Sequence, residues 1–153
     1  MIRIEEWGID RADTVLRLLD KLLKELGEDN GEPGAGCKTG RVLEDWNTNT
    51  GRFYVFAALD ERDEPVGLIT LAECFAIYAG GSYGIINELY VSPPYRSKGV
   101  GKQLLDIVKE TAAKKNWLRI DVVAPLEPKW GRTVRFYERE GFTHAGPKLK
   151  FKI

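Results

Sequence analysis

Apolar positions along the chain recur with helical spacing in four segments. From 11 to 26 they return every three or four residues, which predicts an amphipathic helix ended by Gly27. The stretch 99–115 has the same spacing and predicts a second long helix. Shorter helices are predicted from Thr39 to Trp46 and over 132–139.

The remaining apolar runs are short and predict strands, separated by turn-forming residues. These runs lie at 2–6, 53–59, 65–78, 85–91 and 118–123, around Phe142, and at 149–153. The order gives hairpins first and a strand–helix–strand crossover later. We therefore expect an α/β (α+β) fold with a mixed, mostly antiparallel sheet of about seven strands in a single domain spanning 1–153. The glycine-rich segment 27–40 predicts a loop, and its sequence gives it no evident role.

Charge is balanced overall but unevenly distributed. Residues 1–91 contain 17 acidic and 9 basic side chains, whereas residues 92–153 contain 14 basic and 6 acidic ones. Most of these charges are expected on solvated faces, and the alternative is an anionic cofactor on the basic half and a cationic partner on the acidic half. The basic half lacks the interleaved aromatic residues typical of nucleic-acid binding, so that partner class is disfavoured.

Other compositional features narrow the protein class. No apolar run approaches the roughly 18 residues of a membrane helix, and the N-terminus has no secretory pattern. Two isolated cysteines, Cys37 and Cys74, and one histidine, His144, offer no metal-site spacing. We therefore expect a cytoplasmic protein that uses neither a metal nor a membrane.

Candidate chemistry centres on the turn between the strand 85–91 and the helix 99–115. Two prolines, Arg96, Gly99 and Gly101 connect them, and a glycine turn at a helix N-terminus can bind a phosphate or diphosphate. A Walker A loop is excluded, because Gln103 stands where its hydroxyl residue belongs. A dinucleotide fingerprint is excluded, because it needs three glycines.

Residues 96–101 (R-S-K-G-V-G) resemble the acetyl-CoA signature of the GCN5-related N-acetyltransferase (GNAT) superfamily. Downstream, residues 135–142 (R-F-Y-E-R-E-G-F) are similar to the second conserved segment of that superfamily. The resemblance implies the acetyltransferase fold, with a sheet splayed between its fourth and fifth strands and helices on both faces. It also implies acetyl-CoA as co-substrate and allows a homodimer.

The same resemblance implies the residues that bind acetyl-CoA. Backbone groups of the fourth strand would pair with the pantetheine arm, and N–H groups of the turn would hold the diphosphate. The strand residues are Leu89, Tyr90 and Val91; the turn residues are Arg96, Ser97, Lys98, Gly99, Val100, Gly101 and Lys102. The superfamily often has an asparagine where this chain has Trp130, so one contact to the arm must differ.

Acetyl transfer by direct attack needs a base for the amine and an acid for the departing thiolate. Tyr137 is our candidate acid, because the resemblance places it where the superfamily has its thiolate-protonating tyrosine. Glu88 is our candidate base, because a carboxylate inside an apolar strand is costly without a purpose. Strand alternation predicts that Ile86, Glu88 and Tyr90 share one face.

The acceptor amine is expected to meet side chains of the preceding strand. Glu73 is a rival acidic group there, and the aromatic residues Phe75 and Tyr78 are candidates for the wall of a substrate pocket. As strand aromatics they could equally be cross-strand pairs. The leading hypothesis is an N-acetyltransferase acting on a small cationic primary amine. The alternatives are acetylation of a protein lysine or N-terminal amine, and a non-catalytic acetyl-CoA-binding module.

Overall fold

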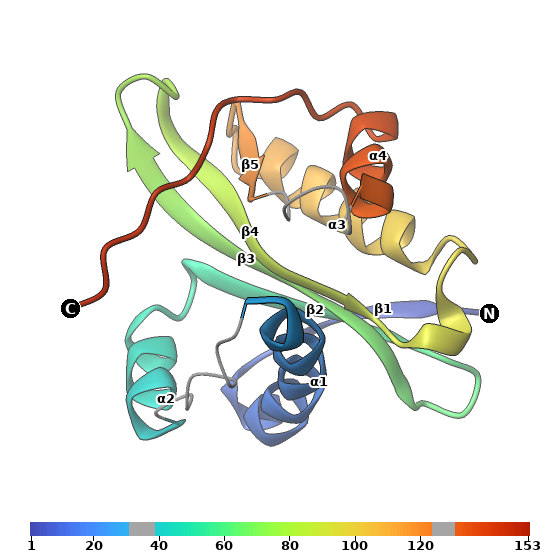
Figure 1. Ribbon diagram of the computed structural model, residues 1–153. Coiled ribbons are helices and arrows are strands. Elements are labelled where there is room, and N and C mark those ends of the chain that lie inside the picture. The colour runs from blue at the N-terminus through green and yellow to red at the C-terminus, as the bar shows by residue number, and fades with distance from the viewer. Residues whose placement is uncertain (31–38, 124–130) are drawn as a thin grey trace. The chain divides into compact units, whose positions relative to one another are not determined.

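The computed structural model describes residues 1–30, 39–123 and 131–153, which form two compact units, Met1–Asp121 and Val122–Ile153 (Figure 1). The elements, in chain order, are β1 (Arg3–Trp7), η1 (Ile9–Arg11), α1 (Ala12–Asn30), α2 (Thr39–Thr48), β2 (Phe53–Leu59), β3 (Pro65–Ala76), β4 (Gly81–Val91), η2 (Pro93–Tyr95), α3 (Val100–Lys114), β5 (Ile120–Val122) and α4 (Gly131–Arg139). The expectation that Gly27 ends the first helix is wrong, because α1 continues to Asn30, and a glycine inside a helix costs only about 1 kcal/mol. Residues 31–38 of the predicted loop 27–40 lie outside the described residues. The expected single domain stays a prediction.

One sheet with the strand order β1-β2-β3-β4-β5 organises the first unit. Neighbours from β1 to β4 run antiparallel, and β5 returns beside β4 after the crossover helix α3. At their junction the Gly84 N–H donates to the Arg119 carbonyl at 3.1 Å. The predicted mixed α/β fold is therefore confirmed, and the parting of the fourth and fifth strands stays a prediction.

The predicted count of seven strands is wrong, because the described residues form five. The difference lies at the C-terminal end, where 142–153 contains no strand although Leu149, Phe151 and Ile153 alternate with lysines. Alternating apolar and polar residues can give a strand one apolar and one polar face. A strand also needs a neighbouring strand that accepts and donates its backbone hydrogen bonds. The three apolar side chains are more than nine-tenths exposed.

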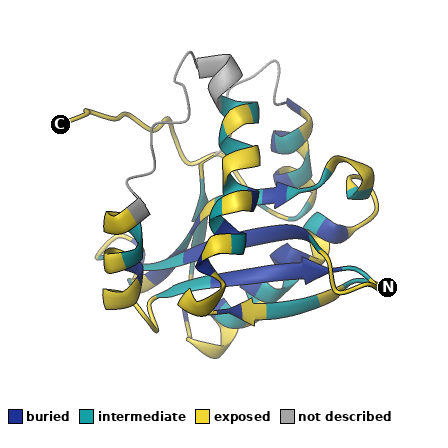
Figure 2. Cartoon of the chain, turned by 90° about the horizontal axis from the view of Figure 1, so that it is seen from below, coloured by how far each residue is buried: buried dark blue, intermediate teal, exposed yellow. Residues whose placement is uncertain are grey.

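Helices α1 and α2 cover one face of the sheet, and alternate strand residues meet them. Because successive side chains of a strand point to opposite faces, β2 sends every second residue to this side. The resulting core cluster contains Trp7, Ala12, Val15, Leu18, Trp46, Val55, Ala57, Leu59, Leu68 and Tyr90. Figure 2 shows the buried positions gathered along the strands and on the inward faces of the helices.

Helix α3 covers the other face with the apolar stripe that its spacing predicted. Val100, Leu104, Leu105, Val108 and Ala112 are buried. The helix comes close because β3 has Gly67 beneath it: a Cβ added there would lie 3.4 Å from the side chains of Val100 and Leu104. Among the described residues, no helix has the length and apolarity that crossing a membrane requires.

Candidate active site

An irregularity in the pairing of β3 with β4 lies at the candidate base. Ile69 pairs with Leu89 and Leu71 pairs with Ile86, so Thr70 alone lies opposite the two residues Asn87 and Glu88. This is the residue count of a β-bulge in β4. Bulges locally bend a strand and redirect a side chain, and the redirected side chain here is a carboxylate.

The bulge decides which face each β4 residue occupies. Leu68 and Tyr90 are partners and both belong to the core under α1. Leu71 is an odd number of residues from Leu68 along the regular strand β3, so it and its partner Ile86 lie on the α3 face. The expectation that Ile86, Glu88 and Tyr90 share one face is therefore wrong for Ile86, because the extra residue reverses the alternation.

Glu88 lies on the face of α1, joined to Thr70 by two hydrogen bonds. The Thr70 hydroxyl donates to Glu88 Oε2 and accepts the Glu88 N–H at 3.1 Å. Burial raises the pKa of Glu88, and the hydrogen bond from Thr70 opposes that rise. The carboxyl group therefore loses its proton at a higher pH than an exposed glutamate does.

Two contacts tie the segment after β4 to the β2–β3 hairpin. The Ser92 N–H donates to the Val66 carbonyl at 2.8 Å. The Tyr95 hydroxyl donates to Asp60 Oδ2, also at 2.8 Å, and that hydrogen bond is the main cause that lowers the pKa of Asp60. These two hydrogen bonds therefore fix the chain just before the predicted phosphate-binding turn.

Arg96 ties the turn to the chain on either side of it. Its N–H donates to the Pro93 carbonyl at 3.2 Å, and its Nε donates to the Val91 carbonyl at 2.7 Å. Its Nη2 forms an ion pair with Glu25 Oε1 of α1 at 2.7 Å. The Arg96 amide, which we predicted to hold a phosphate, is therefore engaged within the turn itself.

The turn then leads into α3 through left-handed backbone. Ser97 has φ 61° and Gly99 has φ 81°, a conformation that glycine adopts without strain. Among the described residues, no side chain caps the helix, and its hydrogen bonding begins with the Gln103 N–H on the Gly99 carbonyl at 3.1 Å. A Cβ at Gly99 would meet no atom within 4 Å. The N–H groups of Val100 and Gly101 thus belong to an open helix start, which fits an anionic group.

The lysines of this turn lie close to it. The Lys98 ammonium is 5.8 Å from the centre of the Tyr95 ring, and Lys102 Nζ is 2.7 Å from Asp106 Oδ2. Both add positive charge beside the helix start, where an anion gains from it.

Glu73 is not brought together with Glu88. It is three residues from Thr70 along β3, so it points to the α3 face. There it accepts a hydrogen bond from Trp117 Nε1 at 3.3 Å and lies 3.7 Å from Lys115 Nζ. Its partners account for its charge without a substrate.

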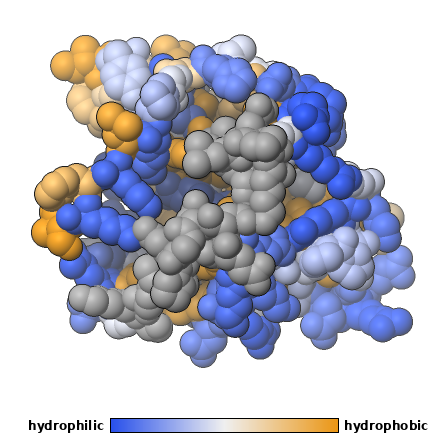
Figure 3. All heavy atoms as spheres, in the orientation of Figure 1, coloured by the Kyte–Doolittle hydropathy of each residue, from blue (hydrophilic) through white to orange (hydrophobic). Residues whose placement is uncertain are grey.

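Phe75 and Tyr78, the predicted pocket wall, lie at the exposed end of the β3–β4 hairpin. Each is 70% exposed. Hydrophobic side chains gather over this turn in Figure 3. The Arg119 guanidinium lies 5.1 Å from the centre of the Tyr78 ring. The two aromatic residues therefore form an open surface in the structure.

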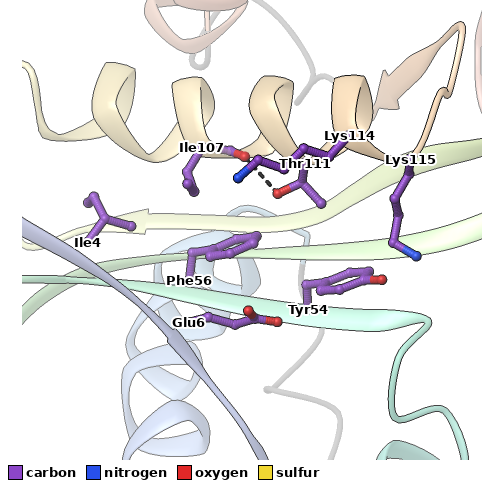
Figure 4. A pocket seen from close by; sticks show the side chains of 8 residues that line it. All are labelled: Ile4, Glu6, Tyr54, Phe56, Ile107, Thr111, Lys114 and Lys115. Carbon is purple, nitrogen blue, oxygen red and sulfur yellow. Dashed lines mark hydrogen bonds between the residues drawn. The ribbon is translucent and has the colours of Figure 1, made fainter.

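The hollow shown in Figure 4 lies away from Glu88, on the opposite face of the sheet. It measures about 320 Å³ and is lined by residues of β1, β2 and α3, among them Glu6, Tyr54, Phe56 and Lys115. Tyr54 and Phe56 alternate with the α1-facing residues of β2 and so belong to the α3 face. This hollow contributes nothing to the candidate site.

Tyr137 belongs to the second unit, on α4. Its side chain is buried, with its ring centre 5.2 Å from that of Phe136 and 5.4 Å from that of Phe142. Burial raises the pKa of its phenol, which keeps the hydroxyl protonated at neutral pH. Trp130 lies outside the described residues.

Comparison of the sequence with models of known families shows to which family the chain belongs. The family model of the acetyltransferase (GNAT) domain matches residues 49–144, which include the bulge, the turn and α4. The chain belongs to the GNAT acetyltransferase family. No curated protein sequence matches it. Among the described residues, no cluster of side chains could hold a metal ion.

Solved structures show the GNAT fold in similar chains of low identity. An aminoglycoside acetyltransferase from an uncultured soil metagenomic sample is 20% identical with a TM-score of 0.76, over 99% of this chain and 95% of that one. A ribosomal-protein-alanine N-acetyltransferase from Brucella melitensis is 18% identical with a TM-score of 0.73, over the whole of both chains. A predicted acetyltransferase with acetyl-CoA from Clostridium acetobutylicum is 19% identical with a TM-score of 0.74, over 99% and 96%.

Sequence reasoning missed the residues that support the candidate site. Thr70 holds Glu88, Asp60 holds the turn through Tyr95, and Glu25 holds Arg96. One signal was available: Thr70 is the sole polar side chain in the apolar run 66–72. The other two contacts join residues far apart in the sequence and leave no local pattern.

Proposed function

We propose that this GNAT acetyltransferase transfers an acetyl group from acetyl-CoA to a primary amine by direct attack. One observation supports the proposal most: the bulge gives β4 a partly buried carboxylate just before the strand enters an open, glycine-lined helix start. A proton acceptor and an anion-binding turn on one strand are what the reaction needs.

The cofactor would be held by β4 and the turn that follows it. Leu89, Tyr90 and Val91 pair with β3 through one edge of β4, and backbone groups of these residues on the other edge would accept the pantetheine arm. The diphosphate would lie at the start of α3, from Ser97 to Lys102, with positive charge from the two lysines. Acetyl-CoA supplies the acetyl group as a thioester, whose C–S bond breaks when the amine nitrogen bonds to the carbonyl carbon.

Glu88 would accept the proton that the amine must lose, directly or through a water molecule. A base works best when its pKa lies near the working pH, and burial moves the pKa of this carboxyl in that direction. The N–H bond of the ammonium breaks, an O–H bond forms on Glu88, and the neutral amine carries the lone pair needed for attack.

Tyr137 would protonate the departing thiolate, and its phenolate would take up the second proton that the nitrogen loses as it becomes an amide. Its raised pKa keeps the phenol protonated until the thiolate forms, so that the proton is available when the C–S bond breaks. No acyl-enzyme is needed, because Cys74 lies in β3 and Cys37 has no activating partner in the sequence.

We favour a small cationic amine as the acceptor, because the acidic excess of residues 1–91 attracts cations. The similar fold of an aminoglycoside acetyltransferase is consistent with this class. A protein amine is the second candidate, since Phe75 and Tyr78 are each exposed, and aromatic side chains are enriched where protein partners bind.

The test is thiol release from acetyl-CoA across aminoglycosides, polyamines, amino acids, lysine peptides and peptides with an N-terminal alanine. Turnover on one class should fall at least tenfold in Glu88→Gln and in Tyr137→Phe, with acetyl-CoA affinity retained. Glu73→Gln is the matched control, because it removes a carboxylate from the opposite face of the same sheet. Tight acetyl-CoA binding without thiol release on any amine would instead support the non-catalytic module.

A further inference from the structure

We propose that Thr70 is a positioning residue: its hydroxyl fixes the bulge of β4 and aims the Glu88 carboxylate toward the acceptor amine. This inference rests on the proposed role of Glu88 as the base. Thr70 itself touches neither the amine nor the acetyl group.

Thr70 is so deeply buried that its hydroxyl needs a hydrogen-bond partner within the protein. The residue is 0% exposed, and apart from aromatic side chains it is the one polar side chain among the buried residues of the described chain. Its neighbours Ile69 and Leu71 are equally buried and apolar. A hydroxyl in such surroundings is costly unless it is hydrogen-bonded, and a valine of the same shape would fill the space.

Both hydrogen bonds of this hydroxyl go to Glu88. It donates to the carboxylate and accepts the backbone N–H of the same residue. A hydroxyl offers one donor and two acceptor positions, so this geometry uses it for the side chain and the backbone at once. In a regular antiparallel ladder a backbone carbonyl would take that N–H, but the bulge interrupts the ladder there.

The consequence for Glu88 is a fixed direction. A side chain held at both its backbone and its tip loses its freedom to choose rotamers, which is what a base aimed at one atom requires. The proton from the ammonium then arrives at a carboxylate oxygen whose position Thr70 has set.

Few groups act on this carboxylate. On the α1 face, β4 packs against α1 and pairs with β3, and within the described residues burial and the Thr70 hydroxyl are the influences on the pKa of Glu88. No lysine, arginine or second carboxylate of those elements adds to them. Removing the hydroxyl therefore leaves burial unopposed.

The experiment compares Thr70→Val with Thr70→Ser. Valine keeps the shape and removes the hydroxyl, whereas serine keeps the hydroxyl and removes a methyl group. Glutamate labelled with ¹³C at the carboxyl carbon reports the titration of Glu88 by NMR, and Glu88→Gln identifies its signal. This readout does not depend on turnover.

We expect the acid dissociation constant of Glu88 to fall about tenfold or more in Thr70→Val, because a hydrogen bond to the charged form is lost. The acidic limb of the pH profile of kcat/KM should move to higher pH by the same factor. The kcat at neutral pH should drop while the KM for acetyl-CoA stays unchanged. In Thr70→Ser, both the pKa of Glu88 and the kcat should stay close to their wild-type values.

An unchanged Glu88 titration and pH profile in a folded, active Thr70→Val protein would overturn the proposal. So would a Thr70→Ser protein that behaves like Thr70→Val, because the hydroxyl would then be irrelevant. If Thr70→Val does not fold, Thr70→Ala takes its place in the same titration. A wild-type protein that releases no thiol with any amine overturns the proposed function, and with it the base role on which this inference rests.

Discussion

Replacing Gly67 by alanine should destabilise the fold at the point where β3, β4 and α3 meet. An added Cβ would lie 2.9 Å from the Tyr90 carbonyl oxygen, a distance that real Cβ contacts essentially never show. The obstructing atom is backbone, so β4 itself must move. On the other side Val100 and Leu104 are already at 3.4 Å, which prevents a shift toward α3.

Overpacking of this kind costs about 1–3 kcal/mol. For a chain of this size that lowers the melting temperature by about 2–4 °C for each kcal/mol. Urea unfolding followed by circular dichroism measures the midpoint and the slope. Because Tyr90 is a proposed contact of the pantetheine arm, acetyl-CoA affinity measured by calorimetry should fall as well.

Gly40→Ala is the matched control. Gly40 lies in α2 with nothing within 4 Å of an added Cβ and has no positive φ. Alanine there should be neutral or stabilise by up to about 1 kcal/mol, because it favours helix. A Gly67→Ala protein as stable as wild type would refute the reasoning, since it would mean that β4 and α3 can separate freely.

Three further predictions concern the turn, the opposite face and pH. Gly99→Ala forces a side chain into φ 81°, which costs about 1–2 kcal/mol, so unfolding should begin at lower urea and acetyl-CoA should bind more weakly; unchanged values in both assays would contradict the left-handed turn. Glu73→Gln should alter kcat less than twofold and stability by at most about 1 kcal/mol, because its partly exposed ion pair with Lys115 is on the face away from Glu88; a large loss of kcat would place Glu73 in the mechanism. Tyr137 has a folded pKa above its unfolded value of 10.0, so its contribution to stability is complete below pH 10 and is lost as pH rises further. The urea midpoint of wild type should therefore fall more steeply above pH 10 than that of Tyr137→Phe, and parallel curves would show that the phenol titrates normally.

The spacing of apolar residues was sufficient to predict the helices and strands that are buried against the core. The apolar run 53–59 is β2, residue for residue, and the four-residue spacing after Gly99 is α3. Both patterns arise because these elements bury one or both faces against the core, and buried positions are apolar in the sequence. The pattern at 149–153 failed because alternation describes the two faces of a strand and contains no information about the neighbour that must complete it.

The candidate site, too, was predicted only where a local pattern pointed to it. Glu88 and the turn 96–101 were predicted as site residues because a carboxylate in an apolar strand and a glycine-rich helix start are local anomalies. The bulge was missed, because it depends on the register between β3 and β4, which no single strand determines. Tyr95 and Asp60 were missed for the same reason: a hydrogen bond across 35 positions has no spacing rule.

The extra residue in β4 has a consequence for how the chain tolerates insertions and deletions. Ile86 and Tyr90 lie on opposite faces although they are four residues apart, because the bulge absorbs one residue. Removing Asn87 would leave them three residues apart, so a regular ladder would keep Tyr90 in the core under α1 and Ile86 on the α3 face. At the hairpin end, Ile77, Tyr78 and Gly80 are exposed, and a change of length there leaves that parity untouched. A deletion of Asn87 would therefore remove the bulge beside Glu88 without exchanging the faces of β4, so the extra residue serves the carboxylate and not the two cores.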